Sequence, residues 1–234
     1  MKKYLTFFLV CFAGYSAICQ SLIGAWEAVF ESDGQDVRMV VIFTEEHQVA
    51  ALYNQETGAF ISTNGGGWFV TGNTLTERVE FDSSNPERVG SQVSFEIELR
   101  EEELSIVGDD RKFVRLDAGE PGALAGAWLI YSRIVDGLPQ GMDPFSPRKT
   151  MKILSGTRFQ WIAFNTETGD FRGTGGGTYT TKDGKYTENI EFFSRDNTRV
   201  GASLEFNYEI VNGNWRHSGK SSKGNPIDET WGRR

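Results

Sequence analysis

The sequence predicts an all-β protein built from two tandem eight-stranded antiparallel meander barrels. Two observations carry this prediction: the chain contains one pattern twice, and apolar and polar residues alternate along much of it. The segment Asn54–Phe60 (NQETGAF) returns as Asn165–Phe171 (NTETGDF), an offset of 111 residues that holds without a gap as far as Phe95 and Phe206. A repeat of this length describes two copies of one structural unit.

The alternation predicts β-strands in both copies. Residues 93–99 and the equivalent residues 204–210 alternate apolar with polar side chains, which is typical of a strand with one buried and one solvated face. Turn signals such as Asp33-Gly34 and Asn212-Gly213 separate the strands. The short connections favour a meander, and closing it into a barrel removes the exposed edges. In the second copy we expect strands at residues 124–134, 148–155, 158–165, 169–180, 184–194, 201–211, 214–220 and 227–233.

The first 19 residues have the features of a signal peptide. Lys2 and Lys3 precede an apolar stretch, and Ala17-Ile18-Cys19 supplies a small-residue cleavage signal before Gln20. A retained anchor and lipidation at Cys19 are the lesser alternatives, because the apolar stretch is short for a bilayer span. We therefore expect an exported, periplasmic or extracellular protein. The expected first barrel covers residues 20–117, a linker 118–123, and the second barrel 124–234.

Composition excludes several kinds of site. Both cysteines, Cys11 and Cys19, lie in the leader, so the mature chain has no disulfide, Cys-ligated metal or Cys nucleophile. His47 and His217 are too few for a usual metal site, and no cofactor motif is present. Without the leader the chain has 22 basic and 32 acidic residues, net −10, which argues against nucleic acid as a partner.

Each copy opens with the same tripeptide, Gly24-Ala25-Trp26 and Gly126-Ala127-Trp128. A Gly-x-Trp on the first strand of an eight-stranded meander resembles the lipocalin-like (calycin) barrels, and the layout is similar to poorly characterised exported bacterial proteins of that type. The resemblance covers nearly the whole mature chain. It implies that the tryptophan closes one end of each barrel beneath an arginine, and that the protein binds small apolar molecules. The matching arginines are Arg115 and Arg233.

The second copy carries nine extra residues between its first two strands, within residues 135–147. The resemblance places this loop over the mouth of the barrel. Three prolines would restrain it, and Met142 and Phe145 would cover a ligand.

A carboxylate is expected inside each barrel. Strand parity puts Glu77 on the face of Val79 and Phe81, and Glu188 on the face of Ile190 and Phe192. A buried carboxylate is costly unless it is paired, and Arg88 or Arg199 in the following loop is the candidate partner. A structural salt bridge is the favoured role, ahead of ligand contact or acid–base work.

The second copy differs from the first at inward-facing positions. Trp161, Trp215 and His217 replace Ala50, Leu104 and Ile106. A single inward histidine is usually a satisfied core residue, although it can also serve as a polar group in an apolar ligand pocket. The candidate pocket residues are Trp161, Glu188, Tyr208, Trp215 and His217, with Met142 and Phe145 from the loop.

No catalytic residues are predicted. The glycine runs at 65–67 and 175–177 lack the context of a phosphate-binding loop and instead favour β-bulges. No nucleophile motif is present. The sequence therefore favours an exported, non-enzymatic protein that binds a small apolar or amphipathic ligand, chiefly in the second barrel. The alternative is a ligand-free interaction module that contacts another envelope protein or a glycan.

Overall fold

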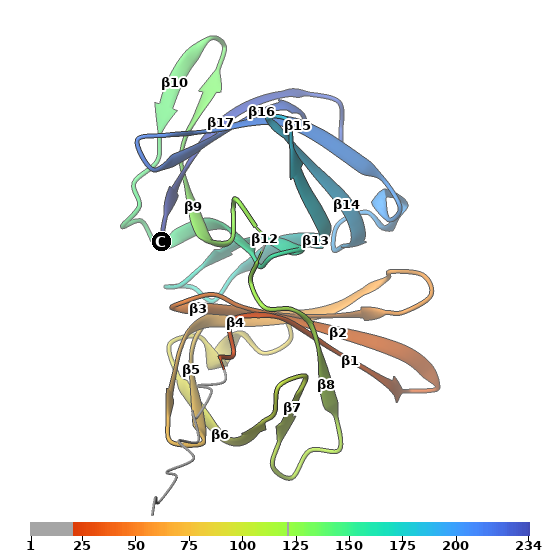
Figure 1. The fold of residues 1–234 in the computed structure, drawn as a ribbon. Helices are drawn as coiled ribbons and strands as arrows, with labels where there is room; N and C mark the ends of the chain where they lie inside the picture. The colour runs from red at the N-terminus through yellow and green to blue at the C-terminus, as the bar shows by residue number, and fades with distance from the viewer. Residues whose placement is uncertain (1–20, 121) are drawn as a thin grey trace, which may run out of the picture.

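The computed structural model describes residues 21–120 and 122–234, which form two β-barrels, one above the other in Figure 1. This confirms the all-β prediction and the two eight-stranded barrels. The predicted signal peptide and its cleavage site lie outside the described residues. Within the described part of the chain, no helix has the length and apolar character needed to cross a membrane.

The first barrel, called barrel 1, is a closed meander in which each strand pairs with the next and the last returns to the first. A 3₁₀ turn, η1 (Pro86–Arg88), connects its fifth and sixth strands. The strands are β1 (Gly24–Ser32), β2 (Gln35–Phe43), β3 (His47–Asn54), β4 (Phe60–Thr71), β5 (Thr74–Asp82), β6 (Gln92–Leu99), β7 (Glu103–Ile106) and β8 (Lys112–Asp117).

The second barrel, called barrel 2, closes in the same way through pairing of its first and last strands. The equivalent 3₁₀ turn is η2 (Asn197–Arg199). The strands are β9 (Gly126–Val135), β10 (Leu138–Gly141), β11 (Arg148–Leu154), β12 (Arg158–Asn165), β13 (Phe171–Lys182), β14 (Lys185–Phe193), β15 (Ser203–Val211), β16 (Asn214–Lys220) and β17 (Pro226–Arg233).

Part of the nine-residue insertion is a strand, which the prediction of a loop at residues 135–147 missed. β10 forms a hairpin with β9, outside the eight strands that close barrel 2. The turn between them, Asp136-Gly137, has φ values of +52° and +77°. Positive φ at both central residues is the geometry of a type I′ hairpin turn, for which Asp-Gly is a preferred pair.

Gly-rich β-bulges occur in both barrels, as the glycine runs predicted. The register of β4 with β5 shifts between Gly65 and Gly66, which leaves Glu80 unpaired as an extra residue. The register of β13 with β14 shifts at the equivalent place and leaves Glu191. An extra residue reverses the face of every side chain beyond it. Phe81 and Phe192 therefore point out of their barrels, and the prediction that they share the inner face of Glu77 and Glu188 is wrong.

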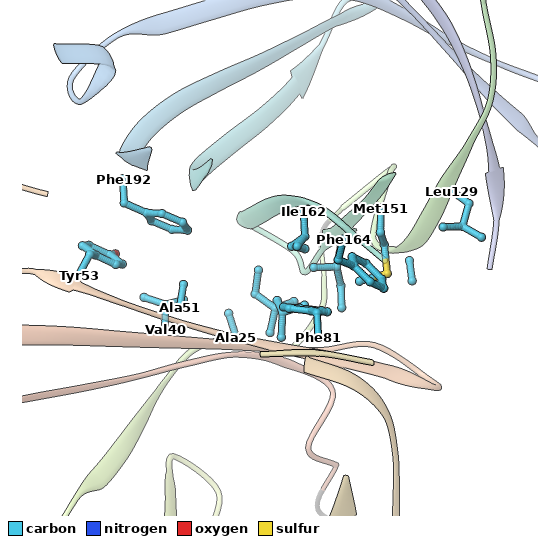
Figure 2. Packing of buried hydrophobic residues seen from close by; sticks show 14 residues of the cluster. Ala25, Val40, Ala51, Tyr53, Phe81, Leu129, Met151, Ile162, Phe164 and Phe192 are labelled. Carbon is cyan, nitrogen blue, oxygen red and sulfur yellow. The ribbon is translucent and has the colours of Figure 1, made fainter. Parts of the chain in front are cut away.

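These outward residues form the contact between the barrels (Figure 2). Tyr53 of barrel 1 stacks on Phe192 of barrel 2, with ring centroids 4.8 Å apart. The equivalent of Tyr53 is Phe164, and it contacts Phe81, the equivalent of Phe192, also at 4.8 Å. The two contacts are reciprocal, so the barrels pack around a pseudo-two-fold axis.

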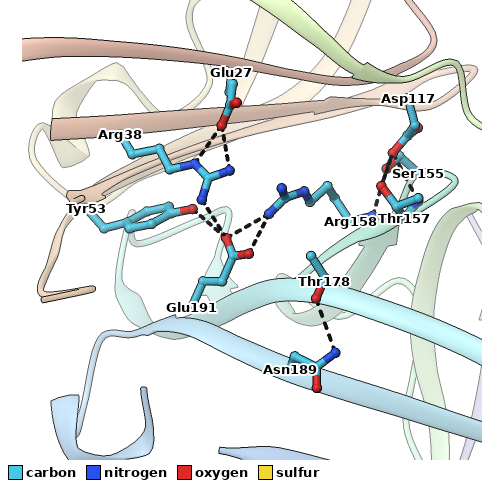
Figure 3. Close-up of polar contacts among 10 residues, drawn as sticks. All are labelled: Glu27, Arg38, Tyr53, Asp117, Ser155, Thr157, Arg158, Thr178, Asn189 and Glu191. Atoms are coloured by element: carbon cyan, nitrogen blue, oxygen red, sulfur yellow. Dashed lines mark hydrogen bonds and ion pairs between the residues drawn. The ribbon is translucent and has the colours of Figure 1, made fainter. Parts of the chain in front are cut away.

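The two bulge carboxylates fix this interface at its polar edges. Glu191 accepts hydrogen bonds from Tyr53 at 2.9 Å and from Arg158 at 2.7 Å, and pairs with Arg38 at 3.4 Å (Figure 3). Its equivalent, Glu80, pairs across the interface with Arg234 at 2.7 Å. The repeated Glu-Phe pair therefore supplies each half of the interface with one anion and one ring.

The Gly-Ala-Trp openings have a steric cause. The Arg233 guanidinium lies 3.9 Å from the centroid of Trp128, and Arg115 lies 4.0 Å from that of Trp26. Gly126 adopts φ +129°, and a Cβ atom there would overlap the Arg233 guanidinium. Glycine is required because only it permits both this backbone and this close approach.

Candidate functional site

The interior of barrel 2 contains a buried ion pair. Lys152 of β11 donates from Nζ to Glu188 Oε1 at 2.7 Å, and both side chains are only 6% exposed. The Tyr186 hydroxyl donates to the same oxygen at 2.8 Å. Burial and the neighbouring Glu188 raise the pKa of Tyr186 well above its ordinary value, so the phenol keeps the proton that it donates. The predicted partners, Arg88 and Arg199, instead bind Asp82 and Asp196 near their own turns.

Aromatic rings surround the Lys152 ammonium. Its Nζ lies between 5.0 and 5.7 Å from four ring centroids. The negative faces of such rings attract a cation, most strongly where water is excluded. This surrounding explains how a lysine is held inside a barrel. The four rings belong to Tyr186, Phe206, Trp215 and Trp231.

A second polar pair lies on the last two strands. His217 Nδ1 is 3.4 Å from Glu229 Oε2. Burial and the Lys152 charge lower the pKa of His217, so the ring is neutral at pH 7. Burial opposes ionisation of Glu229, but the bond with His217 and the nearby Lys152 outweigh it and lower the pKa of this carboxyl. Since a carboxylate only accepts, Nδ1 carries the proton and Nε2 is an acceptor.

Three buried nitrogens in barrel 2 have no hydrogen-bond partner among the described residues. They are Nε2 of His217 and the indole nitrogens of Trp215 and Trp231, whose residues are at most 2% exposed. A buried polar group without a partner costs about 1–3 kcal/mol. Such groups are normally satisfied by protein or by bound water. Barrel 1 has four such atoms among its described residues, on His47, Gln48 and Glu80.

A pocket of about 190 Å³, partly open to solvent, lies inside barrel 2 and is called the inner cavity. Its wall combines aromatic and aliphatic side chains with the polar groups described above. The lining residues are Thr150, Lys152, Trp161, Glu188, Ile190, Phe193, Leu204, Phe206, His217, Ser222, Ile227, Glu229 and Trp231.

A second space of about 430 Å³, called the outer hollow, lies between the β9–β10 insertion and β11. Among the described residues, Thr150 is the one that lines both spaces. Met142 lines the outer hollow and packs against the aromatic cluster of barrel 2. Phe145 does not line either space and is 91% exposed, so its role in covering a ligand stays a prediction. Asp143 Oδ1 accepts from the Phe145 backbone N–H in a short turn there.

The predicted pocket residues divide into two groups. Trp161, Glu188 and His217 line the inner cavity. Trp215 is fully buried between Trp128 and Trp231, with ring centroids 5.7 and 5.9 Å away, and lies behind the wall. Tyr208 is half-buried beside His217 and does not line the cavity either.

Sequence reasoning missed Lys152, Glu229 and Trp231. Parity was an available signal for Lys152, because it shares a face with Thr150 and Leu154 on β11. A lysine on a strand is normally read as the solvated residue. Only the burial of the opposite face against barrel 1 reverses that reading.

Barrel 1 has the same carboxylate without its lysine. Val41 stands where barrel 2 has Lys152, Leu75 where it has Tyr186, and Ile106 where it has His217. Glu77 is 9% exposed, and among the described residues nothing forms an ion pair with it within 4.0 Å. Burial raises the pKa of Glu77 to about 7, more than Arg88 lowers it.

Glu77 should make the stability of the protein depend on pH. A carboxyl whose folded pKa is about 7, above the ordinary 4.5, binds its proton more tightly in the folded state. Its stabilising effect is complete below pH 4.5 and is lost as the pH rises through 7. The loss is about 3 kcal/mol for a shift of this size.

The variant Glu77→Gln is expected to remove this loss, because an amide does not ionise. Denaturant unfolding at pH 5 and pH 8 should show Glu77→Gln more stable than the wild type at pH 8, with a smaller difference at pH 5. Glu96→Gln, on the exposed side of β6, is the control and should leave the pH dependence unchanged. An unchanged pH slope in Glu77→Gln would show that Glu77 is ionised in the folded protein.

Two other spaces lie outside the interior of barrel 2, and the first of them is also lined by a residue with an unpartnered buried nitrogen, His47. A groove of about 750 Å³ follows the barrel interface beside His47, whose pKa burial and Arg234 lower to about 4. A hollow of about 820 Å³ at one end of barrel 1 is lined mainly by apolar residues, Trp68 and Ile97 among them. In residues 21–120 and 122–234, no group of three or more His, Cys, Asp or Glu side chains is placed to hold a metal ion.

Barrel 2 matches a known family model. Residues 123–234 match a family model described as a domain of unknown function, DUF4488. No curated protein matches the chain. The matched region begins just before β9 and contains the ion pair, the aromatic cluster and the inner cavity.

Proposed function

We propose that this chain is an exported, non-enzymatic binding protein that holds a small amphipathic molecule inside barrel 2. The observation that carries the proposal is the inner cavity, where aromatic rings meet buried polar groups that lack partners. Ligand sites are typically apolar cavities with a few placed polar groups that fix orientation.

The likeness of each barrel to the lipocalin-like type supports the proposal. Each has a Gly-x-Trp on its first strand and an arginine from its last strand lying over the tryptophan ring. That resemblance gives an analogy for ligand binding, and the argument for this chain depends on its own residues. A non-enzymatic role is favoured because, among the described residues, His217 bonds Glu229 and no serine or threonine hydroxyl.

An interaction module is the second candidate. Leu138 is 69% and Phe145 is 91% exposed, and both belong to the insertion that barrel 1 lacks. Leu138 lies on β10 and Phe145 in the turn that follows it. Exposed apolar patches are typical of protein contacts. Their joint replacement by serine should abolish partner capture and leave ligand binding in barrel 2 intact if this candidate holds.

Ligand-observed NMR with benzyl alcohol, a small amphipathic probe, tests the proposal. The wild type should bind it, and Leu204→Phe, which fills part of the inner cavity, should bind it at least about tenfold more weakly. Val93→Phe is the matched control, because Val93 is the equivalent of Leu204 and pairs with Glu77 as Leu204 pairs with Glu188. Equal binding by the wild type and Leu204→Phe would place the probe elsewhere and overturn the proposal.

A further inference from the structure

We propose that the ligand of the inner cavity is a neutral, hydroxyl-rich ring of about monosaccharide size. This inference rests on the proposed function and narrows it from amphipathic molecules in general to one chemical class. Three features of the cavity point to it: its open hydrogen-bonding groups, its balance of charge, and its size.

The open hydrogen-bonding groups are of both kinds. His217 Nε2 is an acceptor without a donor, and the Trp231 indole N–H is a donor without an acceptor. Both residues line the inner cavity, and the two nitrogens themselves are buried at its wall. In the ion pair, both Lys152 and Tyr186 donate to Oε1 of Glu188, and no described residue donates to Oε2. A hydroxyl group both donates and accepts, so several hydroxyls on one ring can satisfy this mixture.

The charges inside the cavity disfavour ionic ligands. The Glu188 and Glu229 carboxylates would repel an anion. Lys152 already holds the position of a cation, 2.7 Å from Glu188 and surrounded by four aromatic rings, and would repel an ammonium group brought beside it. A purely hydrocarbon ligand would leave the open donors and acceptors buried and unpaired, at an unfavourable free energy. A neutral polar ligand avoids both penalties.

The shape of the wall suits a ring. Trp161 and Phe193 lie with ring centroids 5.5 Å apart, and Phe206 and Trp231 also face the cavity. Flat aromatic faces give large contact area to the C–H face of a saturated ring. The volume of about 190 Å³ is the space of about six water molecules. It lies below the roughly 300–1,000 Å³ typical of drug-sized ligands, which favours one ring over a long chain.

A series of six-membered rings tests the chemistry directly. The probes are myo-inositol and methyl α-D-glucopyranoside, compared with cyclohexanol, cyclohexylammonium and cyclohexanecarboxylate, by calorimetric titration and ligand-observed NMR. At least one of the two polyols should bind more tightly than cyclohexanol, and the two ions should bind more weakly than the best polyol. Leu204→Phe should abolish this binding, while Val93→Phe should retain it.

Two variants separate polar recognition from shape. His217→Ile installs the residue that barrel 1 has at this position, and Trp231→Phe keeps an aromatic ring but removes the N–H. Each should weaken polyol binding about tenfold, the effect of one hydrogen bond to a buried group, and reduce the preference over cyclohexanol. Tyr208→Phe removes a hydroxyl outside the cavity and should change neither.

The outcomes distinguish this inference from the proposed function. Binding of cyclohexanol that Leu204→Phe abolishes, without tighter binding of either polyol, would overturn the hydroxyl-rich class and leave a small-ligand site in barrel 2. Preference for the ammonium or the carboxylate would also overturn it. If no probe binds, and benzyl alcohol does not bind either, both the inference and the proposed function fail.

Discussion

Replacing Trp128 by alanine is expected to lower the free energy of unfolding by about 3–5 kcal/mol, the usual loss for a buried aromatic residue. Trp128 is 1% exposed, and its indole N–H donates to the Leu124 carbonyl at 2.8 Å. The Arg233 guanidinium covers one side of its ring, and Trp215 contacts it edge-on at 5.7 Å. No small movement of these neighbours would fill the space left by the ring.

The loss should appear in one unfolding transition for the whole protein. The barrels share an apolar interface with reciprocal aromatic contacts, so unfolding of barrel 2 exposes the outer face of barrel 1. Calorimetry of Trp128→Ala and of Trp26→Ala should therefore each show a single peak at lower temperature. Phe145→Ala, at a 91% exposed position, should change stability by less than about 0.5 kcal/mol. A loss below about 1 kcal/mol for Trp128→Ala would contradict the assigned role.

The repeat and the alternation predicted the architecture because both are properties of whole strands. Two copies at a constant offset require two equivalent units, and period two requires strands. The effect of the β-bulge could not be predicted from the alternation. One extra residue reverses which face the following side chains occupy, and it does so without altering the composition. For that reason Glu188 and Ile190 face inward as parity predicts, but Phe192 does not.

The interface was not predictable from either copy alone. On β11, Met151 and Ile153 lie on one face and Lys152 on the other. The ordinary interpretation turns the lysine to solvent and the apolar pair to the barrel core. Here the apolar pair is buried against barrel 1, so the lysine must point inward. The packing of the two barrels decides which face of β11 is buried against barrel 1. The local sequence pattern does not indicate this choice.

The sequence predicted individual residues of the site but not which of them pair with one another. Comparison of the copies singled out Trp161 and His217, because they differ from Ala50 and Ile106. The partner of Glu188 lies 36 residues away on a strand across the barrel. Loop proximity suggested Arg88 or Arg199, but both arginines bind carboxylates within six residues of themselves. Pairing across a closed barrel depends on its diameter and register, which the sequence does not state.

Replacing Lys152 by valine is expected to lower the free energy of unfolding at pH 8 by about 3–5 kcal/mol, because it leaves a buried carboxylate without its cation. The Glu188 side chain is 6% exposed and would keep only the Tyr186 hydroxyl. Valine is the residue that barrel 1 has at this position, Val41. Among the described residues of barrel 1, the carboxyl of Glu77 has no lysine partner, and burial raises its pKa to about 7. The same kind of shift is expected for Glu188 when Lys152 is removed.

A second change should reverse most of the loss. In Lys152→Val/Glu188→Leu both charges of the pair are removed, and well-packed apolar residues replace buried ion pairs with little or no net cost. Urea unfolding of the two single variants and the double variant completes a cycle that isolates the pair. Lys185→Val, which breaks a half-exposed pair with Glu205, is the control and should change stability by less than about 1 kcal/mol. Equal midpoints for the wild type and Lys152→Val would refute the stabilising role of the pair.

The double variant also tests why barrel 2 retains buried charge. If its stability approaches that of the wild type, the ion pair is not needed for folding, and barrel 1 already shows that an apolar group fits beside this position. Lys152 and Glu188 line the inner cavity together with His217 and Glu229. Loss of ligand binding in a double variant that folds normally would then mean that the pair serves recognition. Retention of binding would mean that His217, Glu229 and Trp231 suffice for ligand recognition. The unfolding cycle measures the stability of all the variants under one set of conditions.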